Sequence, residues 1–517
     1  MQIDANEKIS IWLIGNTGLR NPLRIHDGFL LFANSPYIGH FRGVENSLGF
    51  TKLLNDNGII KNEAGKDATG SHARKWRLMF ERFGFIYGQV KKNDPFKQTD
   101  LGEADTITPF GSAFKNADTF PAIQECFLRS LIVEQYLLPN ATSRFSPLRW
   151  ILAIMLELEK RTGSSALSRI EFALWGDTTN PSYSLSDVVD HILDLRQRRS
   201  HAPAKKSFDW KEITIRSEHY GKKSANFLDY CDMNMRYLRI SGILQRKGRG
   251  IQIVPAKHLI AQKLAKSTFS TTPLFDELKC LTNGAPLPTD DFETGKNVLE
   301  NLVEQLRKRH IVFDLSAFPL TTAAEVNIAR HHLEETLAKT NEIYYAAKQK
   351  DQWREISEYM DLLIKGGGKS KAEDDDNIIE VPKDETPAYL EWVLWRAALA
   401  VNHLVNKPYE IRGFRLDADF FPVSAAGGGR GDLYCEFKDF TILTEVTMSS
   451  SSRQEAMEGE PVRRHVSDAI ELYNKPVYGM FIANKIDTNT AETFRHGIWY
   501  TKNDVRQRLT IGKRPII

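Results

Sequence analysis

The segment that most restricts how this chain can fold is residues 431–447, where two apolar stretches flank a short polar pair. Both stretches are rich in apolar and β-branched residues, a composition typical of strands, and Lys438-Asp439 is the predicted turn between them. In a hairpin with a two-residue loop, the position numbers of two cross-strand partners add up to the same value as the position numbers of the two turn residues. Asp432 and Glu445 meet this condition, so the sequence predicts that these two carboxylates face each other.

Two facing carboxylates are destabilising in a sheet unless a cation or a shared proton compensates their charge. Their Cβ atoms are expected about 4.5–5.5 Å apart, and Thr447, two residues beyond Glu445, is predicted on the same face. A divalent cation explains this arrangement most simply. The alternative is a solvated strand face, and Lys438-Asp439 lacks the Gly or Asn that favours a two-residue turn.

The composition is that of an ordinary globular protein. The 517 residues suffice for roughly three domains. Because 69 Lys and Arg oppose 66 Asp and Glu, any nucleic-acid surface must arise from local clustering. The four cysteines are scattered without metal-binding spacing, which argues against a disulfide framework or a zinc finger. No secretory signal and no apolar run of about 18 residues is visible, so we expect a cytoplasmic protein with no membrane partner.

Two segments of the first half combine a helix with a basic hairpin. A helix at 71–83 is predicted to precede a strand, turn and strand at 86–99, and a helix at 225–240 precedes a hairpin at 243–254 with a glycine-containing tip. Such winged-helix-like units place the helix in the DNA major groove and the tip on phosphates; the alternative is that these faces are simply solvated. The candidate DNA contacts are Arg74, Lys75, Arg77, Arg236, Arg239, Arg246, Lys247 and Arg249.

These patterns predict a multidomain α+β protein. Residues 1–290 are predicted to form a mainly helical region that recognises a DNA sequence through two winged-helix-like subdomains. Residues 291–380 form a helical linker that includes a glycine-rich, acidic and flexible run at 366–376, and residues 381–517 form a C-terminal α/β domain. The run is not a phosphate loop, because Leu363 stands where the first glycine of that motif is required.

The C-terminal region has a recognisable order of elements. A strongly apolar helix at 387–401 contains Glu391, which either faces solvent or points at a metal. The hairpin follows, then a helix at 453–473 that continues past Pro461, and a short apolar strand at 476–483. Helix, hairpin, helix and strand is the core order of the PD-(D/E)xK nuclease fold.

Residue identities and spacings at 391–395, 422–427, 432–447 and 458–465 resemble the AlwI family of type IIS restriction and nicking endonucleases, and a weaker similarity extends into the N-terminal half. This resemblance implies recognition of a short asymmetric duplex sequence and cleavage a few base pairs away. It also implies that Glu391, Asp432 and Glu445 are the metal ligands and that Glu458 and His465 act in catalysis. The lysine of the general nuclease motif is replaced by Thr447.

Phosphodiester hydrolysis requires an activated water and charge relief on the phosphorane. Mg²⁺ held by Asp432, Glu445 and Glu391 is expected to supply both, and Mn²⁺ is expected to substitute for it. Thr447 can hydrogen-bond but cannot neutralise charge as lysine does. Glu458 or His465 is a candidate proton acceptor or a holder of a second ion or water; for His465, a phosphate contact beside Arg463 is the equal alternative.

One such centre cuts one strand. Cleavage of both strands therefore needs a transient homodimer or a second nuclease subunit, and a restriction enzyme also needs a cognate DNA methyltransferase to protect its host. Two alternative functions are a DNA-binding regulator with a degenerate nuclease domain, and a DNA repair or transposition nuclease. The presence of all three acids, Glu391, Asp432 and Glu445, argues against the regulator.

Overall fold

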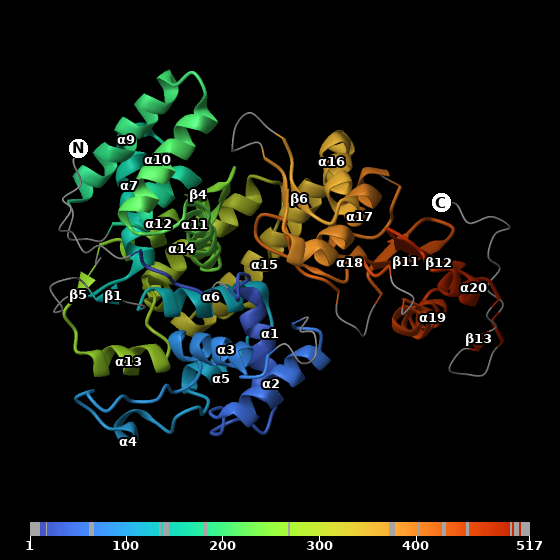
Figure 1. The fold of residues 1–517 in the computed structure, drawn as a ribbon, viewed down its shortest axis with the longest axis horizontal. Helices are drawn as coiled ribbons and strands as arrows, with labels where there is room; N and C mark the ends of the chain where they lie inside the picture. Colours follow the sequence, from blue (N-terminus) through green and yellow to red (C-terminus); the bar gives the residue numbers. More distant parts are fainter. Residues whose placement is uncertain are drawn as a thin grey trace. The chain divides into compact units, whose positions relative to one another are not determined.

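The structure is a computed structural model, mainly helical with small sheets (Figure 1). It describes residues 11–16, 18–60, 67–133, 136–137, 144–179, 184–266, 269–371, 378–401, 403–426, 431–450, 454–496, 499–500 and 506–507. The chain divides into two compact units that meet at residues 337 and 338. None of the described helices has the length and apolar character that crossing a membrane requires.

Unit 1 is built almost wholly of helices. They are α1 (Leu23–Phe32), α2 (Val44–Asp56), α3 (Ser71–Arg82), α4 (Gln98–Leu101), α5 (Pro109–Lys115), α6 (Phe120–Leu131), α7 (Pro147–Thr162), α8 (Arg169–Glu171), α9 (Leu185–His201), α10 (Lys205–His219), α11 (Ser224–Arg239), α12 (His258–Leu264), α13 (Leu274–Thr282) and α14 (Phe292–Arg307). Two small sheets accompany them: β1 (Tyr136–Leu137), β2 (Arg144–Phe145) and β5 (Phe269–Ser270) form one, and β3 (Leu244–Lys247) and β4 (Gly250–Ile253) form the other.

Aromatic side chains form the core of the first part of unit 1. Phe29, Phe80 and Phe85 are fully buried, and the Phe29 ring meets the Phe80 ring edge to face at 5.3 Å between centroids. The Phe85 and Phe114 rings stack at 3.8 Å. Such rings bury large apolar areas, which stabilises the packing of α1, α3 and α5 around them.

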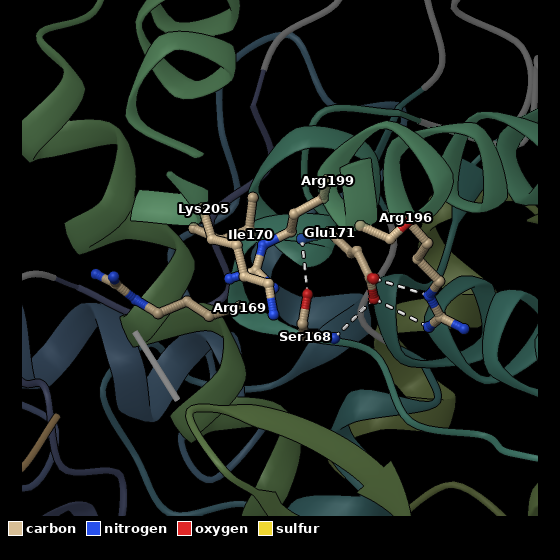
Figure 2. Close-up of a pocket in the computed structure, with 8 residues that line it drawn as sticks. Ser168, Arg169, Ile170, Glu171, Arg196, Arg199 and Lys205 are labelled. Atoms are coloured by element: carbon tan, nitrogen blue, oxygen red, sulfur yellow. Dashed lines mark hydrogen bonds and ion pairs between the residues drawn. The ribbon is translucent and has the colours of Figure 1, made fainter. Parts of the chain in front are cut away.

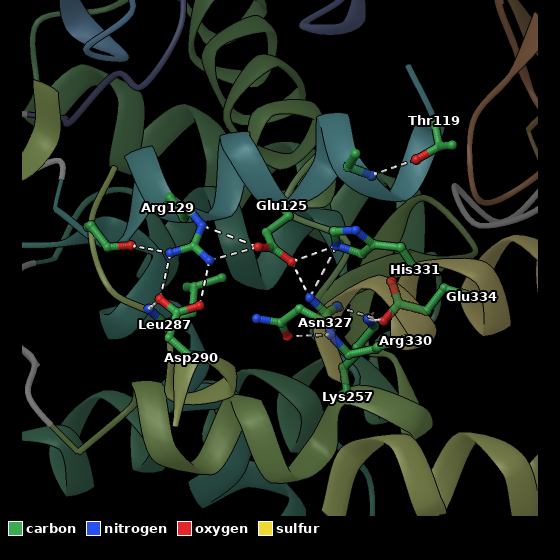
Figure 3. A network of polar contacts seen from close by, with 12 residues as sticks. Thr119, Glu125, Arg129, Lys257, Leu287, Asp290, Asn327, Arg330, His331 and Glu334 are labelled. Carbon is green, nitrogen blue, oxygen red and sulfur yellow. Dashed lines mark hydrogen bonds and ion pairs between the residues drawn. The ribbon is translucent and has the colours of Figure 1, made fainter. Parts of the chain in front are cut away.

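A buried network of ion pairs links α6 to the long helix α15 (Ala323–Ala347) within unit 1 (Figure 3). Glu125 accepts hydrogen bonds from Arg129, Arg330 and His331, with 2.7 Å between Glu125 Oε1 and Arg129 Nη2. Glu334 is paired with both Lys257 and Arg330. Each of these carboxylates therefore has at least two cationic or ring N–H donors beside it.

The two predicted helix–hairpin units had different outcomes. The second is confirmed: α11 is followed by β3 and β4, whose register leaves a two-residue tip. The first is half right. Helix α3 buries Trp76 as expected, but the predicted strand, turn and strand at 86–99 is wrong. Ile86 makes only an isolated bridge to Ile107, and α4 begins at Gln98. Between them, polar side chains accept hydrogen bonds from nearby backbone N–H groups and stabilise turns, as Asp94 does with the Lys91 N–H.

The helices of the predicted linker are packed rather than free. Val298, Leu299 and Leu302 of α14 are buried in unit 1. Helix α16 (Trp353–Ile364) contributes Tyr359 and Leu363 to the core of unit 2. Within the predicted flexible run, β6 (Gly368–Lys369) pairs with β7 (Glu380–Val381), while residues 372–376 lie outside the described part of the chain. The division between the two units falls inside α15. The predicted domain boundaries at 290/291 and 380/381 remain predictions about where one function ends and the next begins.

Unit 2 contains the predicted order of helix, hairpin, helix and strand. Its further elements are α17 (Thr386–Val401), α18 (Pro408–Ile411), β8 (Arg415–Leu416), β9 (Pro422–Ser424), β10 (Leu433–Glu436), β11 (Thr441–Thr447), α19 (Gln454–Leu472), β12 (Val477–Ala483), α20 (Thr488–His496), β13 (Trp499–Tyr500) and β14 (Arg506–Gln507). The principal sheet has the order β10-β11-β12, with β11 antiparallel to β10 and parallel to β12. Helix α19 connects the parallel pair, as parallel strands require a crossover.

The hairpin buries both of its faces, so α17 and α19 cover opposite sides of the sheet (Figure 1). Leu433 and Cys435 pack into the core that contains α17. Tyr434 and Leu443, which alternate with them, pack against Val462 and neighbouring residues of α19. The two-residue period of a strand thus places Asp432 and Glu445 on the α19 side.

Candidate active site

The register of the β10–β11 hairpin is the one predicted from the sequence. Leu433 pairs with Thr444 and Glu436 with Thr441, and these pairs have the same position sum as Asp432 with Glu445. The Phe437 N–H donates to the Phe440 carbonyl at 2.8 Å, which closes the turn at Lys438-Asp439. The absence of Gly or Asn in this turn did not prevent it, because both strands are anchored in apolar cores.

Asp432 lies where β10 begins, with its carboxylate turned toward the end of β11. Its Oδ2 accepts a hydrogen bond from the Val446 N–H at 2.7 Å. Burial, and after it the negative charges of Glu445 and Glu458, raise the pKa of Asp432 to about 7. Because the charge of Glu445 adds to the effect of burial, a proton or a cation shared with Glu445 would relieve the repulsion at Asp432.

Glu445 is buried and paired with a residue of α19. Its Oε1 lies 2.7 Å from His465 Nδ1, and this hydrogen bond raises the pKa of His465 although burial opposes the rise. His465 is 5% exposed, and its Nε2 has no hydrogen-bond partner in the part of the chain that the structure describes. A buried ring nitrogen without a partner is costly in a purely structural role. Glu445 therefore holds the His465 ring through Nδ1, and Nε2 is left as the ring nitrogen that a ligand can reach.

The glycine before the first acid has a spatial reason. A Cβ at Gly431 would lie 2.4 Å from Leu443 Cδ1 and 3.0 Å from Glu445 Oε1. A side chain there would clash with Leu443 and crowd the Glu445 carboxylate, so glycine at this position leaves room for both residues of β11.

The six predicted catalytic residues are brought together only in part. Asp432, Glu445, Glu458 and His465 interact electrostatically, with Glu458 and His465 both on α19. Glu391 is buried on α17, on the other side of the sheet, and its Oε2 accepts a hydrogen bond from the Ala426 N–H at 2.7 Å. Thr447 ends β11 and its Oγ1 accepts from the Ser449 N–H.

The site offers a hard divalent cation two carboxylates rather than a complete set of protein ligands. Across the described residues no group of three or more His, Cys, Asp or Glu side chains is arranged to hold a metal ion. Asp432 and Glu445 remain as a pair of oxygen donors, and His465 offsets only part of the negative charge that they share with Glu458. Mg²⁺ in proteins commonly takes one or two carboxylates and keeps several waters, so this pair fits it. The predicted role of Glu391 as a third ligand stays a prediction.

On α3, the three residues predicted to contact DNA differ in solvent exposure and in their ion pairs. Arg74 is exposed and Lys75 is half-buried. The side chain of Arg77 is only 17% exposed, and its Nε lies 3.5 Å from Glu81 Oε1. Arg77 thus has an internal role in ion pairing as well as the predicted external one.

On α11, Arg236 and Arg239 surround the carboxylate of Asp232. Arg236 Nε is 3.0 Å from Asp232 Oδ2. Burial raises the pKa of Asp232, but Arg236, Arg169 and Arg239 outweigh that effect and hold it below the usual value. Arg169, which the sequence analysis did not single out, belongs to this group. Its signal was hidden because it stands in α8, remote in sequence from the hairpin.

At the tip of the β3–β4 hairpin the basic residues are displayed as predicted. Lys247 is exposed, and Arg246 and Arg249 are half-buried. Arg246 Nε donates to the Gly248 carbonyl at 2.7 Å, and Gly248 has a φ of 57°, which favours glycine at the turn. Contact of these side chains with DNA stays a prediction.

Comparison with known proteins identifies a family for most of the chain. The family model described as AlwI restriction endonuclease matches residues 81–512. That span includes α11, the β3–β4 hairpin, α17 and the site on β10, β11 and α19. No curated protein matches the chain.

Two solved structures show limited likeness. The small subunit (R.BspD6I2) of the heterodimeric restriction endonuclease R.BspD6I has 25% sequence identity, with 23% of this chain and 60% of that chain covered and a TM-score of 0.20. The BpuJ1 endonuclease binding domain, in complex with pyrene- and phenanthrene-modified DNA, has 13% identity, with 55% of this chain and 99% of that chain covered and a TM-score of 0.38. Neither TM-score is high enough to establish a shared fold.

Proposed function

Because this chain belongs to the AlwI restriction endonuclease family, we propose that it is a type IIS restriction endonuclease or a strand-specific nicking subunit. It binds a short asymmetric duplex sequence and hydrolyses a phosphodiester bond a few base pairs away with Mg²⁺, for which Mn²⁺ substitutes. The observation that carries the proposal is the facing pair Asp432 and Glu445, backed by His465, in a hairpin covered on both sides. It acts in the cytoplasm beside a cognate methyltransferase.

The chemistry follows from the residues of the hairpin and of α19. Asp432 and Glu445 would hold the Mg²⁺, whose chemistry would be to polarise the phosphate and lower the pKa of a bound water. His465, oriented by Glu445 at Nδ1, presents Nε2 for a proton or a phosphate oxygen. Glu458 adds negative charge that favours a bound proton or cation at Asp432. Thr447, in place of lysine, supplies a hydroxyl at the edge of the site.

One chain supplies one such hairpin and therefore cuts one strand. Cleavage of both strands requires a second centre, from a transient homodimer or from a separate nuclease subunit. Raising the enzyme concentration on a supercoiled plasmid distinguishes these cases, since a nicking enzyme yields open circles at every concentration and a self-associating one yields linear product as concentration rises.

The decisive variants are Asp432→Ala and Glu445→Ala. Each is expected to lower Mg²⁺-dependent plasmid cleavage at least about 10³-fold, since charge stabilisation of the transition state is lost. Binding to the recognition duplex is expected to persist. Asp439→Ala, in the exposed turn of the same hairpin, is the matched control and should cut normally.

Undiminished cutting by either acid variant would overturn the proposed site. Sequencing the ends produced from a mixed DNA substrate then gives specificity, offset and strand count together. Ends without a fixed sequence nearby would favour a repair or transposition nuclease, and absence of cutting by the wild type with intact sequence-specific binding would favour the regulator.

A further inference from the structure

A cavity of about 250 Å³ in unit 1 lies where α8 and α9 meet the start of α10 (Figure 2). Its lining is strongly basic, with Arg169, Arg196, Arg199 and Lys205 against a single carboxylate, Glu171. None of these residues is among the DNA contacts predicted from the sequence. We call this cavity the basic pocket.

Two arginines of the basic pocket are held in fixed orientations by buried carboxylates. Glu171 Oε1 accepts from Arg196 Nε at 2.8 Å and Glu171 Oε2 from Arg196 Nη2 at 3.0 Å. Asp209, 4% exposed, accepts from Arg199 Nε and Nη2 at 2.8 and 2.9 Å. These fork pairs fix each guanidinium before any ligand arrives, which reduces the entropy lost on binding.

The carboxylate that lines the basic pocket is fully occupied. Besides Arg196, Glu171 Oε2 accepts the Ser168 N–H at 2.9 Å, as Figure 2 shows. Glu171 and Asp209 pair with Arg196 and Arg199, and Asp232 interacts electrostatically with Arg169, so the four cations of the lining outnumber these three carboxylates by one. The local balance therefore favours an anion.

The start of α10 adds to this preference. Lys205 is its first residue and is exposed, and the N-cap Ala204 provides no side-chain hydrogen bond to the first turn. Unsatisfied N–H groups at the start of a 15-residue helix attract negative charge. The helix thus supports the basic side chains rather than standing as a site of its own.

The basic pocket adjoins the β3–β4 hairpin. Leu167, just before Ser168, exchanges two backbone hydrogen bonds with Ile251 of β4, both at 2.9 Å. A Cβ at Gly250 would lie 2.2 Å from the Leu167 carbonyl oxygen and 2.7 Å from Ser168 Cα. Glycine at this position lets the hairpin contact the backbone at Ser168, a residue that lines the basic pocket, so the tip of the hairpin is only one or two residues along the chain from this contact.

We propose that the basic pocket binds a backbone phosphate of duplex DNA, next to the phosphate contacted by the tip of the β3–β4 hairpin. This inference rests on the proposed function. The volume is below the about 300–1,000 Å³ of sites for whole small molecules, so it suits one phosphate group better than a nucleotide. A phosphate held here fixes the orientation of unit 1 on the duplex and carries no sequence information.

The test compares two neighbouring lysines. Lys205 lines the basic pocket, whereas Lys206 is equally exposed and does not line it. Binding of the full chain to its recognition duplex is titrated at several salt concentrations with Ca²⁺ in place of Mg²⁺. Lys205→Ala is expected to weaken binding several-fold on cognate and altered duplexes alike and to reduce the salt slope by about one, because one phosphate contact is lost. Lys206→Ala is expected to match the wild type.

A methylphosphonate scan of the duplex identifies the phosphate concerned. Neutralising that phosphate should weaken binding by the wild type and by Lys206→Ala but not further weaken Lys205→Ala. Arg196→Lys, which keeps the charge and loses the fork, should weaken binding without changing the slope by a full contact.

The outcomes separate this inference from the proposed function. If the wild type binds its duplex and both lysine variants share its slope, the pocket assignment is overturned while the function stands. If inorganic phosphate raises the melting temperature of the wild type and not of Lys205→Ala, yet their DNA binding is equal, the pocket serves a free anion and the DNA assignment is overturned. If the wild type binds no duplex, the proposed function itself fails.

Discussion

Charged side chains gather in both units, but the two gatherings are composed differently. In unit 1, Glu125 is surrounded by Arg129, Arg330 and His331 (Figure 3). In unit 2, the carboxylates of Asp432 and Glu445 have His465 as their near ring donor. With Asp290, Glu334 and Lys257 included, the first cluster is balanced, whereas the second has an excess of negative charge.

The pKa shifts express the same contrast. Burial raises the pKa of Glu125, yet His331, Arg330 and Arg129 outweigh it and hold the pKa well below its usual value. At Asp432, burial and the neighbouring Glu445 act in the same direction and raise the pKa to about 7. A balanced cluster stabilises the fold by itself, whereas an unbalanced one stores repulsion until a cation or proton arrives. Composition of a buried cluster thus separates a structural role from a functional one.

The largest effect on stability is expected from breaking the balanced cluster. Glu125→Ala leaves Arg330, 4% exposed, and Arg129 without their shared carboxylate. Removing one partner of a buried ion pair costs about 3–5 kcal/mol, so the unfolding transition of unit 1 should shift accordingly in urea. Glu304→Ala, which breaks the exposed pair with Arg307, is the control and should leave the transition in place.

Acid should have the matching effect. Because the pKa of Glu125 is depressed on folding, its stabilisation is present above the unfolded pKa and is lost as pH falls through the lower folded value. A Glu125→Ala variant as stable as the wild type at pH 7 would remove the distinction between the two clusters.

At Asp432 the pH dependence should have the opposite sign. Its pKa rises from 3.8 to about 7 on folding, so the folded chain keeps a proton that the unfolded chain releases. Stability therefore falls as pH rises between these values and stays low above them. Asp432→Asn removes this loss and, without divalent ions, should be more stable than the wild type at pH 8 by roughly 1–3 kcal/mol.

The measurement is thermal unfolding in EDTA at several pH values. The advantage of Asp432→Asn should shrink as pH falls toward and below 3.8, because the carboxyl then takes up a proton in the unfolded state as well. An advantage that stays constant across pH would mean that repulsion at Asp432 is absent. Asp439→Asn, in the exposed turn, should show no such trend.

How much was visible in the sequence differs between the same two regions. The β10–β11 register followed from the spacing alone, because the hairpin is local and both faces are apolar-anchored. The resemblance to the family implied a catalytic role for His465, but the pairing of His465 with Glu445, 20 residues apart, was not predicted, since a helix–strand contact has no periodic signature. The hydrogen bond of Glu391 to the Ala426 N–H, 35 residues away, was not foreseeable, because it depends on how α17 packs.

In unit 1 the sequence showed less. A basic helix followed by glycine-containing loops predicted a hairpin at 86–99 that is absent, because side chains such as Gln98 and Asp94 bond to nearby backbone and stabilise turns instead. The basic pocket joins α8, α9 and α10 through Glu171 and Asp209, and neither carboxylate is marked by its neighbours in the sequence. Local patterns were predictable and pairings over long separations were not.

The smallest expected effect is that of Mg²⁺ on the stability of unit 2. It tests the contrast between the two clusters directly, because Mg²⁺ is the cation that the acidic cluster is proposed to bind. Mg²⁺ that binds only the folded site stabilises it by mass action, by about 1.4 kcal/mol at ten times its Kd. The melting transition of unit 2 in the wild type should therefore rise with Mg²⁺ at pH 8, where Asp432 is ionised, and less at pH 5.5, where protons compete. Glu445→Gln should lose the rise, whereas Lys205→Ala, altered in unit 1, should keep it. An equal rise in the wild type and Glu445→Gln would place the ion elsewhere and leave the excess charge at the hairpin without a cationic partner.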